Sequence, residues 1–289
     1  MNWLPAAFIS GVIFGCGGFL LKVGSHKNYP GASMYLGLYL TGSLVLFFTL
    51  MMSGNAKFTG LAFLFAVLVG FGSYYGNSFL VRAYDTGPAS ITSPLMSTNI
   101  LLVILLSAIL YHEQIAPKQY IGIGLMMVAI SLLGFNFQKI VIKSRLWLVF
   151  VVLSVLFVFL REGGLKIAHE SGLNNQTILF LSYVFASALA LTRIMNEKRN
   201  NRELLQPVIH KHAFLLGTSI GVFSATGLSL LAYAIARGPA SIIIPVFSVR
   251  NFVAIILIVI FYREKLTRIQ WIAVCLLISG IFFISPVGK

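Results

Sequence analysis

The chain reads Gly87-Pro88-Ala89-Ser90-Ile91 and then, 151 residues later, Gly238-Pro239-Ala240-Ser241-Ile242. The same offset pairs Gly70 with Gly221, Ser73 with Ser224, Gly76 with Gly227, Ser78 with Ser229, Pro94 with Pro245, Ser97 with Ser248, Tyr111 with Tyr262, and Glu113 with Glu264. Upstream, an offset of 144 residues pairs Lys22 with Lys166, Tyr39 with Tyr183, and Ser43 with Ser187. The difference of 7 residues places an insertion in the polar stretch 193–212. The chain therefore contains two copies of one unit.

The rest of the chain is built from apolar segments long enough to cross a membrane. Of the 289 residues, 58% are hydrophobic and 10% are charged, and the mean hydropathy is +0.93. This composition excludes a water-soluble enzyme, a disordered chain and an ordinary nucleic-acid-binding protein. A membrane-spanning helix takes about 20 residues. On that scale the predicted spans cover residues 3–22, 32–52, 60–83, 88–110, 117–135, 146–168, 174–194, 213–235, 239–262 and 268–286.

The two copies divide these spans equally. We predict an all-α membrane protein of ten transmembrane helices, with one five-helix repeat at residues 1–140 and a second at residues 141–289. Because each repeat has an odd number of helices, the second enters the membrane from the opposite side, and the repeats are inverted. Inverted repeats are typical of secondary transporters, which bind their substrate near the membrane midplane between the repeats.

The basic residues indicate an orientation in the membrane. The net charge is +14, from 21 Lys and Arg against 7 Asp and Glu. Five of the basic residues lie on the N-terminal side of the predicted spans, fourteen on the opposite side, and two, Arg161 and Arg250, inside spans. Lysine and arginine in short connections favour the cytoplasmic side. We therefore predict a multi-pass protein of a bacterial inner membrane with both termini outside, and no binding of nucleic acid.

Three charged residues lie inside predicted spans, where insertion of a charge costs roughly 2.5–3.5 kcal/mol. Arg250 falls about ten residues into span nine, and Arg161 and Glu162 fall in the second half of span six. We predict that all three belong to a substrate pathway. One alternative is a structural ion pair between Arg161 and Glu162, although adjacent residues on a helix face each other poorly. Another is that Arg161 extends to the membrane interface.

Polar residues on other spans extend this candidate site. Asn99 is the repeat mate of Arg250, and Asn251 follows Arg250 in span nine. Tyrosine and asparagine combine contact area with hydrogen bonding, which suits a binding pocket, and their alternative role is hydrogen bonding between helices. The predicted substrate-binding residues are Arg250, Asn99, Arg161, Glu162, Tyr74, Asn77, Asn251, Tyr39 and Tyr183.

Over essentially its whole length the chain resembles the ten-helix EamA-type branch of the drug/metabolite transporter superfamily. The residues that carry the resemblance are the pairs Ala89-Ser90 and Ala240-Ser241, the glutamates Glu113 and Glu264 that close the same two spans, and Phe14-Gly15 followed by Lys22. The resemblance implies a basket-like helix bundle that moves small metabolites, often amino acids. It leaves the substrate open.

The sequence departs from the pattern of that family at two places on the expected pathway. Ile100 and Asn251 stand where the family often has a proline about thirteen residues before the glutamate. Arg161-Glu162 of the second repeat stands where the 144-residue offset places Gly17-Gly18 of the first. The substrates of well-known members therefore do not transfer to this chain.

The glutamates that close spans four and nine receive a different interpretation. Glu113 and Glu264 are repeat mates at opposite ends of the membrane. We predict that they anchor or gate their spans rather than contact the substrate. Glu113 would cap or pair at the interface with Lys118, and Glu264 with Lys265 or Arg268.

The predicted function is secondary transport of a small metabolite, amino-acid-like or anionic, by alternating access. The alternatives are a lipid or lipid-phosphate flippase on the same fold, a channel, and, from another class, an intramembrane enzyme. An enzyme is disfavoured because Glu162 is the one acidic residue at membrane depth and no histidine accompanies it. Cys16 and Cys275 lie in apolar runs, so we predict no disulfide, metal or cofactor. Since both halves lie in one chain, a monomer suffices.

Overall fold

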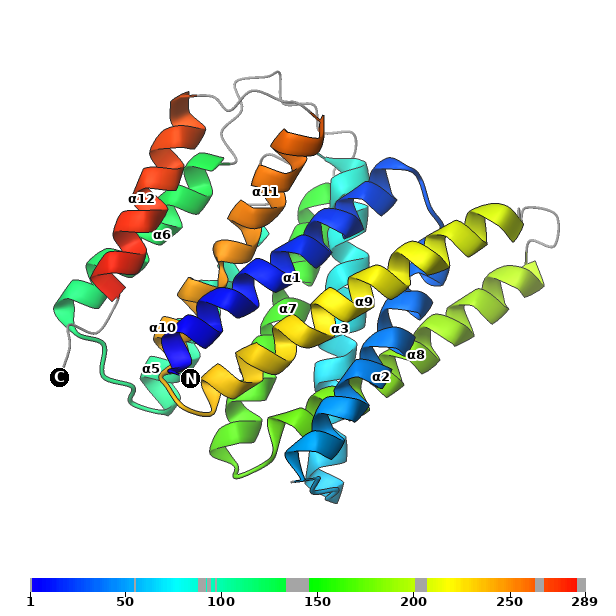
Figure 1. The fold of residues 1–289 in the computed structure, drawn as a ribbon, viewed down its shortest axis with the longest axis horizontal. Coiled ribbons are helices and arrows are strands. Elements are labelled where there is room, and N and C mark those ends of the chain that lie inside the picture. The colour runs from blue at the N-terminus through cyan, green and yellow to red at the C-terminus, as the bar shows by residue number, and fades with distance from the viewer. Residues whose placement is uncertain are drawn as a thin grey trace.

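The computed structural model describes residues 2–54, 56–87, 92, 95–96, 98–133, 146–200, 207–262 and 268–284. Within these ranges every regular element is an α-helix (Figure 1). The helices are α1 (Trp3–His26), α2 (Gly31–Ser53), α3 (Gly60–Thr86), α5 (Thr98–Leu110), α6 (Pro117–Leu133), α7 (Leu146–Glu170), α8 (Asn175–Asn200), α9 (Pro207–Ile235), α10 (Ala240–Phe247), α11 (Val249–Tyr262) and α12 (Arg268–Ile284).

Within the described residues these helices confirm the predicted spans, with α10 and α11 together forming span nine. Most of residues 88–97, the first part of predicted span four, lies outside the described residues. Six of the helices, α1, α2, α3, α7, α8 and α9, are long and apolar enough to cross a membrane. The polar stretch 193–212 is shorter as a connection than predicted, because α8 continues to Asn200 and α9 begins at Pro207. Arg193 pairs with Glu197 one turn later at 3.0 Å, which supports a helix within polar sequence.

The packing of the helices has the two-fold pattern of an inverted repeat. α1 packs on α9, and its counterpart α7 packs on α3. α2 packs on its own counterpart α8, and α6 packs on its own counterpart α12. In Figure 1 the pair α6 and α12 stands at one end of the molecule, and α2, α8 and α9 lie toward the other end. The predicted boundary between residues 140 and 141 lies outside the described residues and stays a prediction.

The ends of the helices define two faces. At the N-terminal face α1 begins, α5 and α7 end, and α10 begins. At the basic face α1, α3 and α8 end and α9 begins. We call the second face the basic face because the sequence places fourteen basic residues on that side.

Glycines allow α2 and α9 to lie with their backbones in contact. A Cβ atom on Gly217 would overlap the carbonyl oxygen of Met34, and one on Gly221 would overlap that of Leu38. Between helices in lipid, close van der Waals packing of this kind replaces the hydrophobic effect. The two repeats are therefore joined tightly along the halves of α2 and α9 that lead to the basic face.

Span nine is interrupted near its middle. Pro245 lies inside α10 and has no N–H group to donate to the preceding turn. α10 ends at Phe247 and α11 begins at Val249, with the intervening Ser248 hydroxyl donating to the carbonyl oxygen of Pro245 at 2.5 Å. Interrupted helices commonly line the substrate sites of transporters. The interruption comes directly before Arg250.

The contact between α2 and α9 gives a first prediction. Gly217→Ala should lower the free energy of unfolding by about 1–3 kcal/mol, because the new methyl group displaces the backbone of α2. Thermal unfolding in detergent measures this. Gly18→Ala is the matched control, since a Cβ atom at Gly18 meets no atom within 4 Å. Equal melting temperatures for the two variants would contradict the prediction.

Candidate functional site

A buried carboxylate joins three spans at the centre of the bundle. Glu162 on α7 has 0% of its surface exposed. Its Oε1 atom accepts hydrogen bonds from Arg161 Nη2 at 2.8 Å and from Arg250 Nη1 at 2.6 Å. Its Oε2 atom accepts a hydrogen bond from Asn99 Nδ2 at 2.7 Å. We call these four residues the central cluster, which brings together α5 of the first repeat and α7 and α11 of the second.

The ion pair between Arg161 and Glu162 corrects the expectation that these neighbours face each other poorly. The arginine side chain is long enough to extend around the helix and reach the same oxygen that Arg250 binds. Arg161 is also buried, with 3% of its surface exposed, so it does not extend to the membrane interface. The structural ion pair is therefore present, and it is shared with a second arginine from another span.

Aromatic rings pack against both arginines. The centre of the Phe14 ring on α1 lies 5.4 Å from Arg161 Cζ and 5.6 Å from Arg250 Cζ. The Phe247 ring lies 4.4 Å from Arg250 Cζ. A Cβ atom on Gly15 would lie 2.7 Å from the Arg250 carbonyl oxygen, so glycine is what lets α11 approach α1 here. The Phe14-Gly15 pair, known from sequence only as part of a family resemblance, thus packs against the central cluster.

The central cluster has a net positive charge and unused hydrogen-bonding atoms. Two arginines against one glutamate leave one positive charge. Among the described residues, Arg161 Nε and Asn99 Oδ1 are buried without a hydrogen-bond partner. A buried polar atom without a hydrogen bond lowers the free energy of unfolding by about 1–3 kcal/mol. The unused N–H donor of Arg161 therefore lies beside an uncompensated positive charge, an arrangement that can bind an anionic group.

The predicted tyrosines form a second group beside the cluster. Asn77 Nδ2 on α3 donates to the Tyr39 hydroxyl at 3.1 Å. The Tyr39 ring contacts those of Tyr74 and Tyr183, with centres 6.1 and 5.3 Å apart. The Tyr183 hydroxyl shares a hydrogen bond of 2.6 Å with the Ser224 hydroxyl. The four predicted residues thus lie together, in contacts that also serve the alternative role of joining helices.

Asn251 is the remaining predicted residue. It follows Arg250 in α11, is half-buried, and donates its backbone N–H to the Ser248 carbonyl oxygen at 2.9 Å. The structure therefore places it next to Arg250 of the central cluster in the chain.

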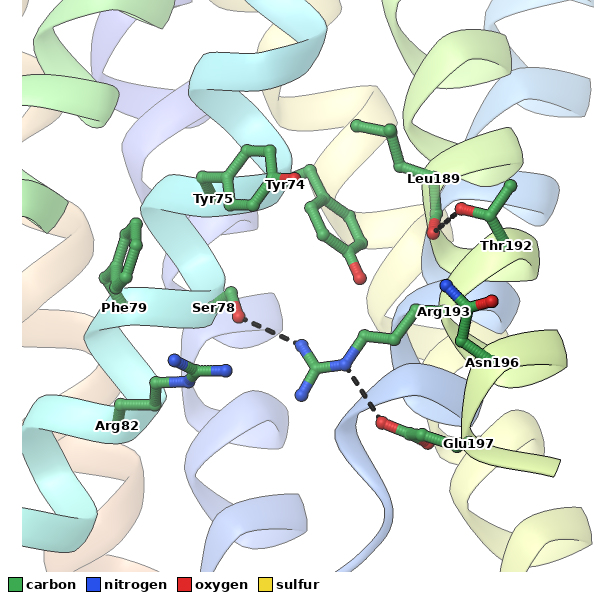
Figure 2. A pocket seen from close by; sticks show the side chains of 10 residues that line it. All are labelled: Tyr74, Tyr75, Ser78, Phe79, Arg82, Leu189, Thr192, Arg193, Asn196 and Glu197. Atoms are coloured by element: carbon green, nitrogen blue, oxygen red, sulfur yellow. Dashed lines mark hydrogen bonds and ion pairs between the residues drawn. The ribbon is translucent and has the colours of Figure 1, made fainter. Parts of the chain in front are cut away.

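A pocket opens between α3 and α8 near the basic face (Figure 2). Its volume is about 470 Å³. The residues that line it are Tyr74, Tyr75, Ser78, Phe79, Arg82, Leu189, Thr192, Arg193, Asn196 and Glu197. Arg193 crosses it, donating to Ser78 Oγ at 3.2 Å and to Glu197 Oε1 at 3.0 Å. Figure 2 shows the Tyr74 hydroxyl pointing toward Arg193.

The two arginines of this pocket have no charged counterpart in the opposite repeat. The offsets of 151 and 144 residues place Tyr233 and Thr49 at the positions equivalent to Arg82 and Arg193. Sequence reasoning counted both arginines as part of the connections and missed the pocket. The four-residue spacing of Arg193 and Glu197 was the available signal that α8 continues through the polar sequence as a helix, which places both side chains on one face of α8.

Metal ligands do not gather in the described parts of the chain. Within those ranges no group of three or more His, Cys, Asp or Glu side chains lies close enough to hold a metal ion.

Comparison with known proteins identifies the family. The model of the EamA-like transporter family matches residues 1–135 and again residues 145–285. The chain belongs to the EamA-like transporter family. It is accordingly a multi-pass membrane transporter of the drug/metabolite superfamily, whose members are transporters rather than enzymes.

Two further matches agree with this fold. An uncharacterized protein of Methanocaldococcus jannaschii is 38% identical over 64 residues, which are 22% of this chain and 47% of that protein. The chain thus matches about half the length of this curated relative. A solved crystal structure of a protein with 14% sequence identity superposes with a TM-score of 0.73, covering 98% of this chain and 97% of that one. At this identity the superposition shows the fold alone.

The central cluster gives a second prediction. Glu162→Gln should lower the free energy of unfolding by about 3–5 kcal/mol, because it leaves two buried arginines without a counter-charge. Thermal unfolding in detergent tests this against Glu197→Gln, which removes an exposed i,i+4 partner of Arg193 and should cost less than about 1 kcal/mol. If Glu162→Gln unfolds at the temperature of the control, the ion pairs do not stabilise the bundle.

Proposed function

We propose that this transporter moves a small molecule with a carboxylate or phosphate group, by alternating access between its inverted repeats. The observation that carries the proposal is the central cluster, in which Arg161 and Arg250 share one carboxylate in the middle of the bundle. A charged group is costly at this depth and is usually retained for function. The surplus positive charge is what an anionic substrate would neutralise.

The donors of the two arginines support this chemistry. A guanidinium group has five N–H donors in a plane and binds carboxylate and phosphate groups through two parallel hydrogen bonds. Arg161 Nε is buried and unpaired among the described residues, and Arg250 keeps 13% of its side chain exposed. Glu162 fixes both guanidinium groups in place while Phe14 packs against each. The cluster is thus held in position before a substrate binds.

A route from the basic face supports the same proposal. Tyr74 lines the pocket between α3 and α8 and contacts Tyr39 deeper in the bundle. Gly72, two residues before Tyr74 on α3, packs so closely on α7 that a Cβ atom there would lie 2.7 Å from the backbone nitrogen of Arg161. The pocket volume of about 470 Å³ suits a small metabolite. Substrate would enter at Arg82 and Arg193 and pass along the tyrosines to the central cluster.

Binding to a panel of compounds tests the substrate class. Wild-type protein in detergent is heated with amino acids, organic acids, phosphorylated sugars and lipid phosphates, because a ligand that binds the folded state raises its melting temperature. A shift produced only by compounds with an anionic group supports the proposal. A shift produced only by lipid phosphates would replace metabolite transport by lipid flipping. Shifts with cationic or uncharged compounds alone would refute the anionic substrate.

The role of Arg250 gives a third prediction. Arg250→Ala should lower kcat/KM for exchange of the identified substrate in proteoliposomes by about 10- to 100-fold, through loss of a charge-assisted hydrogen bond. The variant should stay folded, because Glu162 keeps Arg161 and Asn99. Arg237→Ala is the control, since Arg237 is exposed and stacks on Tyr233 at 3.7 Å. Unchanged exchange by Arg250→Ala would remove this residue from the pathway.

The charge of the connections gives a fourth prediction, on orientation. We infer that the basic face is cytoplasmic and that both termini lie outside, in the cytoplasmic membrane of a bacterium. Alkaline phosphatase fused after α12 should then be active, and green fluorescent protein fused at the same place should be dark. The reverse pattern would place the basic face outside.

One chain carries both repeats, so the expected functional unit is the monomer.

A further inference from the structure

The pocket between α3 and α8 has two arginines whose charged ends face each other. Figure 2 shows the guanidinium groups of Arg82 and Arg193 pointing toward one another across the pocket. Arg193 pairs with Glu197 at 3.0 Å, whereas Arg82 makes no ion pair with any residue that the structure describes. Two arginines against one glutamate leave one positive charge in the pocket. Like charges held face to face repel each other, and an anion between them removes this repulsion.

An acidic residue stands close to Arg82 in the sequence but does not neutralise it. Asp85 follows three residues later on α3, a spacing that allows an ion pair on a helix. Its Oδ1 atom instead accepts a hydrogen bond from Ser25 Oγ at 3.4 Å, and Asp85 does not line the pocket. The positive charge of Arg82 is therefore available to a group from outside the chain.

A buried lysine at the N-terminal face shows the contrast, because two carboxylates neutralise it. Lys166 on α7 pairs with Glu113 at 2.6 Å and with Glu170 at 2.5 Å. Lys118 was the predicted partner of Glu113, and the structure places Lys166 there instead. The Glu113 carboxylate also accepts the backbone N–H groups of the first two residues of α10, at 3.1 and 2.9 Å, so it ties two spans together. One lysine there meets two carboxylates, whereas two arginines share one in the pocket.

Aromatic rings hold Arg82 in place without using its hydrogen-bond donors. Its Cζ atom lies 5.9 Å from the ring centres of both Phe79 and Phe150. Cation–π contacts of this kind stabilise a guanidinium group through the face of a ring. Among the described residues, none accepts a hydrogen bond from the Arg82 guanidinium group, so its five N–H donors remain for a ligand.

Two hydroxyl groups on α3 add further donors. Ser78 Oγ accepts a hydrogen bond from Arg193 Nη1 at 3.2 Å, which leaves its own proton free to be donated. The Tyr74 hydroxyl is buried without a hydrogen-bond partner among the described residues, and it points toward Arg193 (Figure 2). Donors therefore converge on the pocket from both helices and from several directions.

A phosphate group matches these donors better than a carboxylate does. A terminal phosphate has three oxygens around a tetrahedral centre and accepts hydrogen bonds from several directions, whereas a carboxylate is planar and one guanidinium group satisfies it. Basic pockets between membrane helices on the cytoplasmic side bind the phosphate head groups of lipids, and the basic face is the one inferred to be cytoplasmic. The pocket volume of about 470 Å³ leaves room for the molecule that carries the phosphate.

We infer that the pocket between α3 and α8 is a binding site for a phosphate group, held between Arg82 and Arg193 and within reach of the Tyr74 and Ser78 hydroxyls. The ring of Phe79 lines the same pocket and contacts the rest of the molecule. The phosphate belongs to a soluble phosphorylated metabolite or to a lipid head group, since both present the same oxygens. The inference rests on the proposed function, whose entry route passes through this pocket, and it names the anionic group that is recognised there.

Protection of arginines from phenylglyoxal tests the site residue by residue. The full chain is purified in an uncharged detergent, phenylglyoxal modifies accessible guanidinium groups, and mass spectrometry gives the rate at each arginine. Glycerol 3-phosphate is the probe, and glycerate, which has a carboxylate instead, is compared at equal ionic strength. At about four times Kd, glycerol 3-phosphate should slow modification of Arg82 about fivefold, because a filled site does not react. Glycerate should give little protection. Arg199, exposed on α8 at the same face, is the control and should be unaffected by either compound.

Three variants give the affinity a direction. Arg82→Gln should raise the concentration of glycerol 3-phosphate that half-protects Arg193 at least about tenfold, through loss of charge-assisted hydrogen bonds. Glu197→Gln should lower it about threefold, because it removes the competing negative charge. Arg199→Gln is the matched control and should leave it unchanged. General loosening of the bundle would not shift the two pocket variants in opposite directions.

Nanodiscs separate the two sources of phosphate. Wild-type protein is placed in phosphatidylcholine alone or in an equal mixture of phosphatidylcholine and phosphatidylglycerol. Protection of Arg82 by phosphatidylglycerol, without soluble phosphate and with Arg199 unaffected, identifies a lipid head group. Protection that appears only when glycerol 3-phosphate is added identifies a soluble metabolite. Both results support the phosphate site.

Other outcomes overturn the inference. It fails if glycerol 3-phosphate leaves Arg82 unprotected, if glycerate protects Arg82 equally well, or if Arg199 is protected to the same extent. Size-exclusion profiles and melting temperatures identify a variant that has not folded. If Arg82→Gln does not fold, Arg82→Lys, which keeps the charge without the planar group of donors, must still raise the half-protecting concentration, or the inference fails.

The same measurements separate this inference from the proposed function. Melting shifts that depend on Arg250 and occur with carboxylates alone, with Arg82 left unprotected by phosphate, would defeat the inference and leave the proposed function standing. Protection of Arg82 by glycerol 3-phosphate, without any anion-dependent effect of Arg250→Ala, would do the reverse.

Discussion

The structure depends on neutralising one carboxylate that has no access to water. An unpaired charge inside a membrane protein is expensive, and removing one partner of a buried pair costs more than the pair gains. Glu162 therefore requires Arg161 and Arg250 beside it, and Arg250 requires α11 to lie against α7. Asn99 holds α5 in place through its hydrogen bond to the other carboxylate oxygen of Glu162. The Phe14 ring holds α1 in place by packing against Arg250. Four spans from both repeats thus meet around Glu162 and the two arginines that bind it.

Duplication of the five-helix unit explains how the helices pair, whereas the charged residues of the candidate site lie where the two repeats differ. Paired helices such as α2 with α8 and α6 with α12 follow from two copies related by a two-fold axis. The charges of the central cluster do not follow from this symmetry, since Gly17-Gly18 of the first repeat corresponds to Arg161-Glu162 of the second. The pocket arginines likewise have uncharged counterparts. A symmetric bundle gives two equivalent faces, whereas these substitutions give the two halves of the bundle different electrostatics.

Much of this fold could be predicted from sequence, because membrane spans follow from hydropathy and the repeat fixes how they pair. The candidate site was predicted in part. Asn99 and Arg250 were linked as repeat mates, and both bind Glu162. The contact between Arg161 and Glu162 was considered but disfavoured, because helical spacing gives the direction in which each side chain leaves the helix and not the position that the end of a long arginine can reach. The pocket was missed because Arg82 and Arg193 fall at the very ends of their predicted spans and were counted with the connections, whereas α3 and α8 continue past them.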